Sequence, residues 1–380
     1  MVALRHKQQG VAIVMVMLFV AVAVISLSTL AYKQHGSITR TANLNTLAEL
    51  RALQTSIADY LAADVLQQSK PFDSPEADWT ECKTALPFVN EEVEFVACVY
   101  EQNGLFNLNN LVNSDGQQVE AEVVKFKYLL QALELPIEIA DVIGDWLDTD
   151  EISNGFDQES QYYKLLDPGY LPSQRPLVSL SELGLLKTFR EDPKLLEQLL
   201  PHVTVLPPQE EPTKINANFA STAMLESLRP YDSGEFEIDP EVTIGLFEEQ
   251  PSVPLTTMIA EAQTANESAE EAAEPQLAGT EPEEETVLAS YNPPVEGKPA
   301  YETIDDFIAT INSSLVGIKP NENTEAPVYE FENKDSITLQ SNYFLIQLNI
   351  AKSGLAREYH ALYRRDDGQM TPIWQSENTW

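Results

Sequence analysis

The chain has 380 residues, a formal net charge of -37 and an isoelectric point near 4.2. A chain of this length buries a sizeable core and suggests two or three modules. Such an acidic surface excludes nucleic acid as a partner, because a phosphate backbone requires a basic surface, and it makes divalent cations better partners.

The N-terminal region has the pattern of a membrane anchor. A short basic leader ends at Gly10 and runs directly into an uncharged stretch from Val11 to Tyr32. This stretch is long enough to cross the ~30 Å hydrocarbon core as one helix. Because positive charge precedes the span, we expect the N-terminus in the cytoplasm and the acidic bulk outside it. Thr29 and Ala31 resemble a signal-peptide cleavage site, but a signal peptide has a shorter apolar core.

Beyond the span, leucine and isoleucine recur every three or four residues, which predicts that the helix continues as an amphipathic arm to about Leu66. Two strand candidates follow, Ala85–Phe88 and Val93–Tyr100. The two cysteines of the chain, Cys82 and Cys98, lie at this hairpin or its approach. We expect a disulfide between them, because disulfides persist in exported proteins. Two buried thiols are the alternative.

The pattern changes to short helices from Leu105 onward. Helices are predicted over Val119–Leu133, Ile137–Leu147, Ser179–Leu186, Pro193–Leu200 and Tyr301–Leu315. The segment from Glu261 to Ser290 is rich in Glu and contains no Lys or Arg. It cannot bury enough apolar surface to order itself, so we expect a disordered loop within the helical block.

Strand periodicity returns near the C-terminus. Strands are predicted over Tyr343–Ile350, Glu358–Arg364 and Gln369–Trp374, with a turn at Asp366–Gly368. Besides one another, their expected sheet partner is the hairpin before residue 101. The sequence therefore predicts a sheet whose strands come from both ends of the chain, with a helical block between them.

An acidic run follows the second predicted helix of this block. Seven oxygen-bearing side chains lie close together in it: Asp145, Asp148, Asp150, Glu151, Asn154, Asp157 and Glu159. Calcium takes six to eight oxygen ligands and tolerates irregular loops. Histidine and cysteine are absent from the run, which disfavours zinc and copper. The alternative is a solvated acidic loop that caps the helix ending at Leu147.

Catalysis has little support in the sequence. The four histidines are His6, His35, His202 and His360, and none belongs to a Ser, Cys or metal constellation. Glycosidases use a pair of carboxylic acids, and the many carboxylates of this chain could supply such a pair. No cluster of sugar-binding aromatic residues accompanies them, however. We therefore expect a protein that is not an enzyme.

The leader resembles that of type IV pilins and type II secretion pseudopilins, in which a glycine is followed at once by an apolar helix. In these families a prepilin peptidase cuts after the glycine and methylates the new N-terminus, so the resemblance places the cut between Gly10 and Val11. The families usually have Glu at the fifth mature position, where this chain has Met15. That carboxylate is costly in lipid unless it pairs with the amine of a neighbouring subunit. The pseudopilin known to lack it is general secretion pathway protein K, the large minor pseudopilin at the tip.

Short motifs along the chain extend the resemblance to the protein K family. They lie at Asn107–Asn109, Asp145–Asp150, Tyr162–Tyr163, Arg175–Leu183 and Ile215–Asn218. The resemblance implies an α+β fold: a pilin-like long N-terminal helix and small antiparallel sheet, with a large, mainly helical domain inserted between strands. The expected limits are a leader at 1–10, a helix at 11–66 with 11–32 in the membrane, a pilin-like domain at 67–104 and 336–380, and an insertion at 105–335.

The resemblance also implies a function and a location. It predicts an inner-membrane minor pseudopilin that caps the type II secretion pseudopilus and starts its assembly with other minor pseudopilins, for export of folded proteins across the outer membrane. The prepilin peptidase and the inner-membrane assembly platform are further implied partners, with secreted cargo or the secretin as additional ones. The alternatives are a tip receptor for cargo, a minor pilin of a type IV pilus, and an unprocessed signal-anchored periplasmic protein.

A structural calcium ion in the Asp-rich loop is a further implication of the family. Its ligands would come from Asp145, Asp148, Asp150, Glu151, Asp157 and Glu159, with Asp148, Asp150 and Glu159 first. The family tends to have a Glu-Asp pair where this chain has Glu159-Ser160. For Asn107 and Asn109 we expect a role in satisfying turn backbone, and for Arg175 a local pair with an acid.

Overall fold

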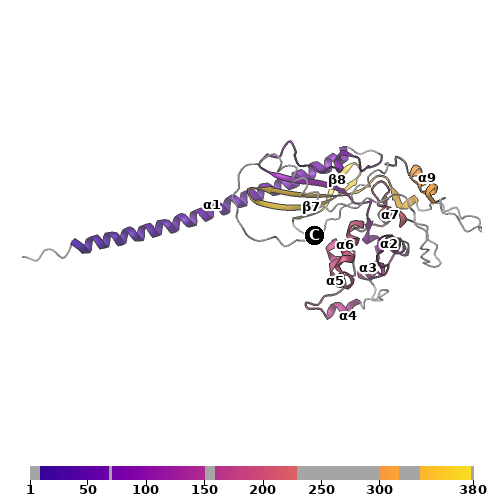
Figure 1. The fold of residues 1–380 in the computed structure, drawn as a ribbon, viewed down its shortest axis with the longest axis horizontal. Coiled ribbons are helices and arrows are strands. Elements are labelled where there is room, and N and C mark those ends of the chain that lie inside the picture. The colour runs from indigo at the N-terminus through magenta and orange to yellow at the C-terminus, as the bar shows by residue number, and fades with distance from the viewer. Residues whose placement is uncertain (1–8, 68–70, 150–158, 229–299, 316–333, 378–380) are drawn as a thin grey trace, which may run out of the picture.

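The computed structural model describes residues 9–67, 71–149, 159–228, 300–315 and 334–377 (Figure 1). Helix α1 (Gln9–Gln67) projects from the body as a single rod over its first half. It contains no proline, and it ends shortly before Pro71. Hydroxyl groups in its apolar half donate to the preceding turn, as Ser26 Oγ does to the carbonyl of Val22 at 2.8 Å. These bonds satisfy the polar side chains that a membrane would otherwise leave without partners.

A four-stranded antiparallel sheet packs against the second half of α1. Its order is β1 (Glu94–Glu101), β6 (Tyr343–Lys352), β7 (Leu355–Asp366) and β8 (Gln369–Glu377). Two-residue turns with positive φ at Ser353–Gly354 and Asp367–Gly368 join the last three strands. Because β1 pairs with β6, the sheet joins two parts of the chain that are far apart in sequence.

The core of this pilin-like module lies between α1 and one face of the sheet. On the helix side it contains fully buried residues such as Leu50, Ile57 and Val65. On the sheet side alternate residues point inward: Phe95, Ala97 and Val99 from β1, Phe344, Ile346, Leu348 and Ile350 from β6, and Tyr359, Ala361 and Tyr363 from β7. A disulfide between Cys82 and Cys98 fastens the preceding loop to β1.

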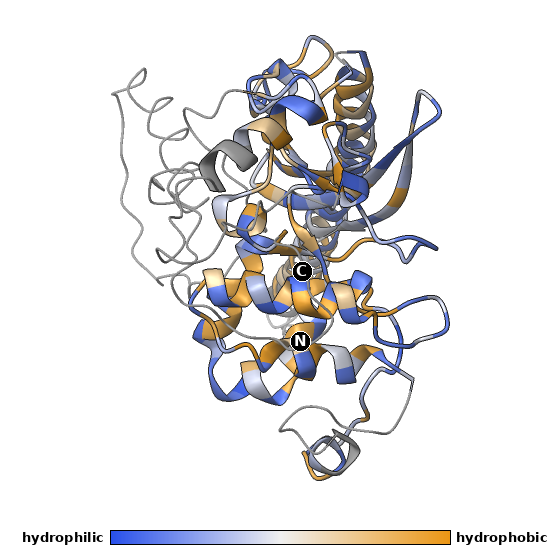
Figure 2. Cartoon of the chain, turned by 90° about the vertical axis from the view of Figure 1, so that its right-hand side faces the viewer, coloured by the Kyte–Doolittle hydropathy of each residue, from blue (hydrophilic) through white to orange (hydrophobic). Residues whose placement is uncertain are grey.

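The helical module is built from short elements between β1 and β6. Its α-helices are α2 (Glu120–Ala132), α3 (Ile139–Leu147), α4 (Glu159–Lys164), α5 (Lys187–Glu191), α6 (Pro193–Leu199), α7 (Thr222–Glu226) and α9 (Ile304–Leu315). Two short parallel pairs link its segments, β2 (Phe106–Asn107) with β3 (Val203–Thr204) and β4 (Ile215–Asn216) with β5 (Ile337–Thr338). The coloured helices of this module carry both apolar and polar residues (Figure 2). The apolar ones form a second core around Phe106, Phe126 and Trp146.

The structure confirms the predicted fold class and the pairing of the C-terminal strands with the strand before residue 101. The predicted strand at Ala85–Phe88 is wrong: the segment forms loops and turns, and only Lys83 bridges to Ala97. The helix predicted over Ser179–Leu186 is instead the 3₁₀ helix η3 (Leu180–Leu185), begun by a capping box of Ser179 and Glu182. The segment Glu261–Ser290 lies outside the described residues.

Candidate functional site

The first half of α1 is the one helix among the described residues that is long and apolar enough to cross a membrane. None of its most apolar part is buried against the rest of the described chain. Large side chains such as Leu18 and Phe19 are exposed along it. This geometry fits a single-pass membrane anchor. Gly10 and Val11 lie in its first turns, and cleavage between them remains a prediction.

A buried polar cluster lies where the two modules meet, and we call it the junction clamp: Asp73, Glu101, Ser341 and Arg365. Arg365 forms an ion pair with Asp73, with Nη1 at 3.1 Å from Oδ1 and Nη2 bonded to Oδ2. Nη2 also donates to the Ser341 carbonyl, and the amide of Ser341 donates to Asp73 Oδ2 at 2.6 Å. The clamp therefore ties the loop after α1, the chain entering β6 and the end of β7 together.

Glu101 completes the clamp at the point where the chain leaves β1. Its carboxylate accepts from the amides of Asn103 and Gly104, each at 2.7 Å, and from the Ser341 hydroxyl. Burial raises the pKa of Glu101 to about 8, against the lowering effect of these three donors. The chain therefore leaves the sheet by turning around the Glu101 carboxylate, and a negative charge is costly in this buried position.

Buried asparagines hold the crossing segments of the helical module. The Asn109 side chain donates to the carbonyls of Leu177 and Leu206 and accepts from the amide of Leu177. Asn218 likewise bonds the backbone of Asp73 and Tyr301. These side chains act as backbone partners where no regular ladder exists, because buried peptide groups must be paired. The prediction that Asn107 satisfies turn backbone is confirmed, because its Oδ1 accepts from the amide of Asn109. For Asn109 the prediction is wrong in its partner, since this side chain bonds the backbone of the distant residues Leu177 and Leu206 and not of a turn.

The two cores also interlock at one aromatic residue of the helical module. Phe219 stacks on Trp79 of the pilin-like core, with ring centroids 5.7 Å apart. A side chain at Gly104 would collide with Phe219, because a Cβ there would lie 2.8 Å from Phe219 backbone and side-chain atoms. Together with the junction clamp, this contact fixes the helical module against the sheet.

The acidic run is described in part. Asp145 and Asp148 are 5% and 2% exposed, and both face the amide of Gln118, whose Nε2 lies 3.5 Å from Asp145 Oδ1 and 2.7 Å from Asp148 Oδ2. Asp150, Glu151 and Asp157 lie outside the described residues, and Glu159 begins α4. No group of three His, Cys, Asp or Glu ligands occurs within the described part of the chain. Asp145 and Asp148 present the carboxylate oxygens that calcium takes as ligands, although the Gln118 amide already donates to both.

An aromatic cluster lies beside this run and is built on the Tyr162–Tyr163 motif. Trp146 and Tyr163 meet edge to face at 5.3 Å, and Tyr163 and Tyr170 lie 5.3 Å apart. Arg175 pairs with Glu182 at 3.1 Å, which confirms the predicted local ion pair. The end of α3 is therefore packed on its aromatic side and acidic on the side of Asp145 and Asp148.

Strand alternation could have revealed two clamp residues that the sequence analysis missed. Glu101 continues the inward positions Val99 and Ala97 of β1, and Arg365 continues the inward position Tyr363 of β7. Two opposite charges at inward positions of the same sheet predict a buried polar contact. Asp73 and Ser341 lie in loops and gave no comparable signal.

A long, exposed N-terminal helix whose second half packs on an antiparallel sheet defines the pilin class of membrane-anchored subunits, here with a helical module between β1 and β6. Residues 104–208 match the family model of type II secretion system protein K. Type II secretion system protein K of Pseudomonas aeruginosa is 32% identical over 251 residues, which are 62% of this chain and 72% of that protein.

Two further comparisons agree. Protein K of Klebsiella pneumoniae is 30% identical over 246 residues, covering 60% of this chain and 72% of that protein. A chain in the crystal structure of the GspK-GspI-GspJ complex from enterotoxigenic Escherichia coli has the same fold, with a TM-score of 0.58 at 15% identity over 90% of this chain and 100% of that chain. The chain belongs to the type II secretion system protein K family.

Proposed function

We propose that this protein caps the tip of the type II secretion pseudopilus and starts its assembly together with other minor pseudopilins. The observation that carries the proposal is the place of the helical module. It stands at the end of the molecule opposite to the projecting half of α1 (Figure 1). In a filament whose subunits stack through their α1 helices, this module lies where the next subunit would have to sit.

The junction clamp supports this role. A blocking module has to keep its orientation, and a hinged one would swing aside. Arg365, Asp73 and Ser341 are each no more than 7% exposed and bond to one another. Two asparagines of the helical module attach to this cluster: Asn216 donates to the Ser341 hydroxyl at 2.6 Å, and Asn218 donates to the Asp73 carbonyl at 2.9 Å. Breaking such a buried ion pair is costly, so the helical module is held in one position.

Met15 supports a terminal position independently. It lies in the membrane half of α1, where related subunits are expected to carry a carboxylate for the amine of their neighbour. A subunit without this carboxylate has no such neighbour to neutralise, as at the end of a filament. Complex formation in the GspK-GspI-GspJ structure supports other minor pseudopilins as partners.

Labelling of assembled filaments tests the cap directly. Pseudopili assembled in cells are sheared, and an antibody against the helical module is detected by electron microscopy. We expect label at one end of each filament and fewer filaments in cells that lack the protein. Label along the filament length would contradict the cap, and an unchanged filament number would contradict the initiating role.

Processing by the prepilin peptidase is the first step that the proposal requires, with the assembly platform acting afterwards. N-terminal sequencing and mass measurement of the mature protein, from cells with and without the peptidase, test it. We expect a methylated N-terminus at Val11 that disappears without the peptidase. A mature protein that begins at Met1, or after Ala31, would contradict the pseudopilin function.

A structural calcium ion is the second part of the proposal. The buried carboxylates of Asp145 and Asp148 at the end of α3 support it, since an ion would balance their charge. Asp150, Glu151, Asp157 and Glu159 are the further ligand candidates in the adjoining segment. The ion would supply charge balance and hold the segment after α3 to the module.

Thermal unfolding with calcium and with a chelator tests this part. We expect calcium to raise the midpoint of the wild-type protein and to have no effect on Asp148→Asn. Asp141→Asn is the matched control, because Asp141 lies on the same helix and pairs with Lys127 at 2.8 Å. Equal calcium effects on the wild type and Asp148→Asn would contradict the site.

A tip receptor for secreted cargo is the second candidate function. The segment from Leu165 to Leu185 exposes apolar side chains, with Leu165 at 86% and Val178 at 70%. Exposed apolar groups in one region are typical of interaction surfaces. A Leu165→Ser/Val178→Ser variant that caps filaments but no longer secretes would favour the receptor, whereas unchanged secretion would leave capping as the function.

A further inference from the structure

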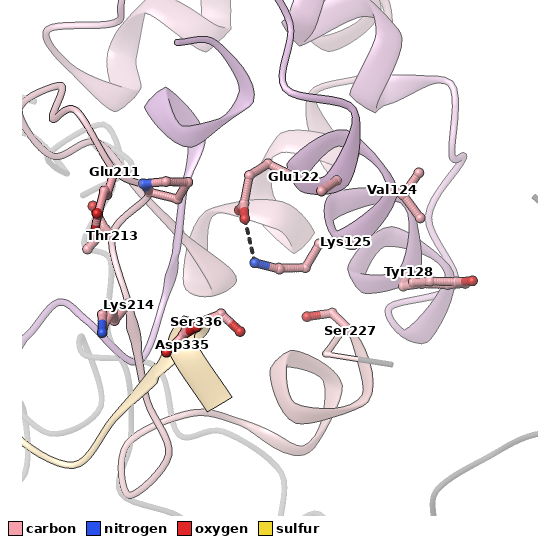
Figure 3. Close-up of a pocket in the computed structure, with 12 residues that line it drawn as sticks. Glu122, Val124, Lys125, Tyr128, Glu211, Thr213, Lys214, Ser227, Asp335 and Ser336 are labelled. Carbon is pink, nitrogen blue, oxygen red and sulfur yellow. Dashed lines mark hydrogen bonds and ion pairs between the residues drawn. The ribbon is translucent and has the colours of Figure 1, made fainter. Parts of the chain in front are cut away.

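A cavity of about 530 Å³ opens in the helical module, outside the junction clamp and the acidic run (Figure 3). Its walls come from α2, from the loop Glu211–Lys214, from the end of α7 at Ser227 and from the turn Asp335–Ser336 before β5. Its size falls within the range of natural ligand sites, which run from about 300 to 1,000 Å³.

The inner wall carries a buried ion pair. Glu122 and Lys125, one turn apart on α2, are 5% and 8% exposed, and Glu122 Oε1 lies 2.6 Å from Lys125 Nζ. Figure 3 shows the two side chains pointing toward one another along the wall that α2 forms. The second carboxylate oxygen, Glu122 Oε2, is buried and accepts no hydrogen bond from any residue that the structure describes. A buried carboxylate oxygen requires a donor, and a group entering the cavity can supply one.

The charges of the wall favour a cation as that donor. Lys125 is neutralised by Glu122, which leaves two carboxylates, Glu211 and Asp335, against Lys214. The net charge of -37 adds a negative field over the whole molecule. Glu122 and Lys125 neutralise each other, so the other charges of the wall, which are net negative, are what favour a cation over an anion.

The apolar part of the wall restricts the ligand further. Ala121, Val124 and Pro212 contribute surface without charges, next to the polar inner end. Lysine and arginine side chains match this combination of apolar and polar surface, because each has an apolar stem and a cationic head that donates several hydrogen bonds. The cavity is larger than one such side chain needs, which leaves room for flanking backbone.

We propose that this cavity binds the ammonium or guanidinium group of a lysine or arginine side chain presented by a polypeptide. The head group donates to Glu122 Oε2, the stem lies along Ala121 and Val124, and the flanking peptide reaches the rim at Glu211 and Asp335. This site goes beyond filament capping, because it gives the helical module a specific contact for a protein partner.

Binding of blocked tripeptides to the full-length protein in detergent micelles tests the site, by saturation-transfer NMR and titration. We expect Gly-Arg-Gly or Gly-Lys-Gly to bind at least about tenfold more tightly than Gly-norleucine-Gly, because a charged hydrogen bond distinguishes them. Equal affinities would overturn the proposal. Putrescine serves as a free diamine, and if it binds as tightly as the tripeptides it overturns the polypeptide part.

Two variants and a control locate the binding. Glu122→Gln removes the charged acceptor and should weaken Gly-Arg-Gly by about tenfold or more. Ala121→Trp fills the cavity from an exposed position on α2 and should abolish binding even if Glu122→Gln fails to fold. Ala85→Trp, at an exposed position in the pilin-like module, should bind as the wild type does.

Unchanged affinity in a folded Ala121→Trp protein would place the peptide elsewhere and overturn the assignment. The assay uses the isolated protein, so its result does not depend on filament capping. Conversely, a protein that binds the tripeptides but labels filaments along their length would retain the site and lose the proposed function.

Discussion

The pilin-like module and the helical module are stabilised in different ways. In the first, long regular elements pair their own backbone, and a continuous apolar face of α1 covers the sheet. In the second, the described helices have no more than 13 residues, and side chains such as Asn109 and Asn218 pair the backbone between them. The second arrangement therefore depends on individual side-chain amides.

The junction clamp combines both arrangements, and breaking it should have the largest effect. Arg365→Leu leaves Asp73 buried without its cation, so we expect the free energy of unfolding to fall by about 4 kcal/mol. Denaturant unfolding of the full-length protein in micelles measures it. Arg364→Leu is the matched control: its side chain is 37% exposed and pairs with Asp366 at 3.2 Å, so we expect a loss below about 1 kcal/mol. Equal losses would refute the clamp.

Removing the disulfide should weaken the pilin-like module alone. The bond closes a sequence separation of 16 residues, which predicts a loss of about 3 kcal/mol for Cys82→Ser/Cys98→Ser. Hydrogen exchange should show faster opening in β1 and unchanged protection in α2 and α3. Wild-type protein with reductant is the control and should behave as the double variant does. Equal loosening of the two modules would contradict their separate stabilisation.

Removing one buried asparagine should weaken the helical module alone. Asn109→Ala leaves the backbone groups of Leu177 and Leu206 without their partners, and we expect a loss of about 2 kcal/mol confined to the helical module. Hydrogen exchange at the Leu177 amide reports it. Asn113→Ala is the control, since its side chain bonds the amides of Asp115 and Gln117 in an exposed turn. A comparable effect of the control would show that buried amides have no special role.

The pH dependence of stability should report Glu101. Its pKa rises from 4.5 to about 8 on folding, so between these values the unfolded chain has lost a proton that the folded chain retains. The contribution to stability is present below pH 4.5 and is lost as the pH rises to 8, by about 1.4 kcal/mol per pH unit. Unfolding midpoints of the wild type and Glu101→Gln, compared across this window, measure it. Parallel curves would contradict the shift.

Elements with a regular apolar periodicity could be predicted from the sequence alone. The apolar repeats of α1 and the alternation in β6 and β7 gave their elements within a few residues, because one face of each is buried. The segment Ala85–Phe88 has a strand-like composition but lacks a partner strand among the described residues. Only the residues just before it are attached to β1, through the Cys82–Cys98 disulfide and the Lys83–Ala97 bridge.

The contacts between segments could not be predicted in the same way. Nothing in the spacing of Asn109 identifies Leu177 and Leu206 as its partners, since these lie far along the chain. The candidate calcium ligands were recognised as a run of acids, yet their arrangement depends on three-dimensional placement that spacing does not give. Glu122 and Lys125 have the i,i+3 spacing that is common for ion pairs on a helix surface, and only the surrounding chain buries them.

The register of β1 on β6 has a consequence for the order in which the protein folds. Glu101 pairs with Phe344, so neighbouring strands are separated by the entire helical module. Closing so long a loop before its contents are compact is slow, because the entropy must be lost before the pairing compensates for it. We therefore expect the module to fold first and bring the strands together. The sheet would then close late in folding, after most of the chain has emerged from the membrane.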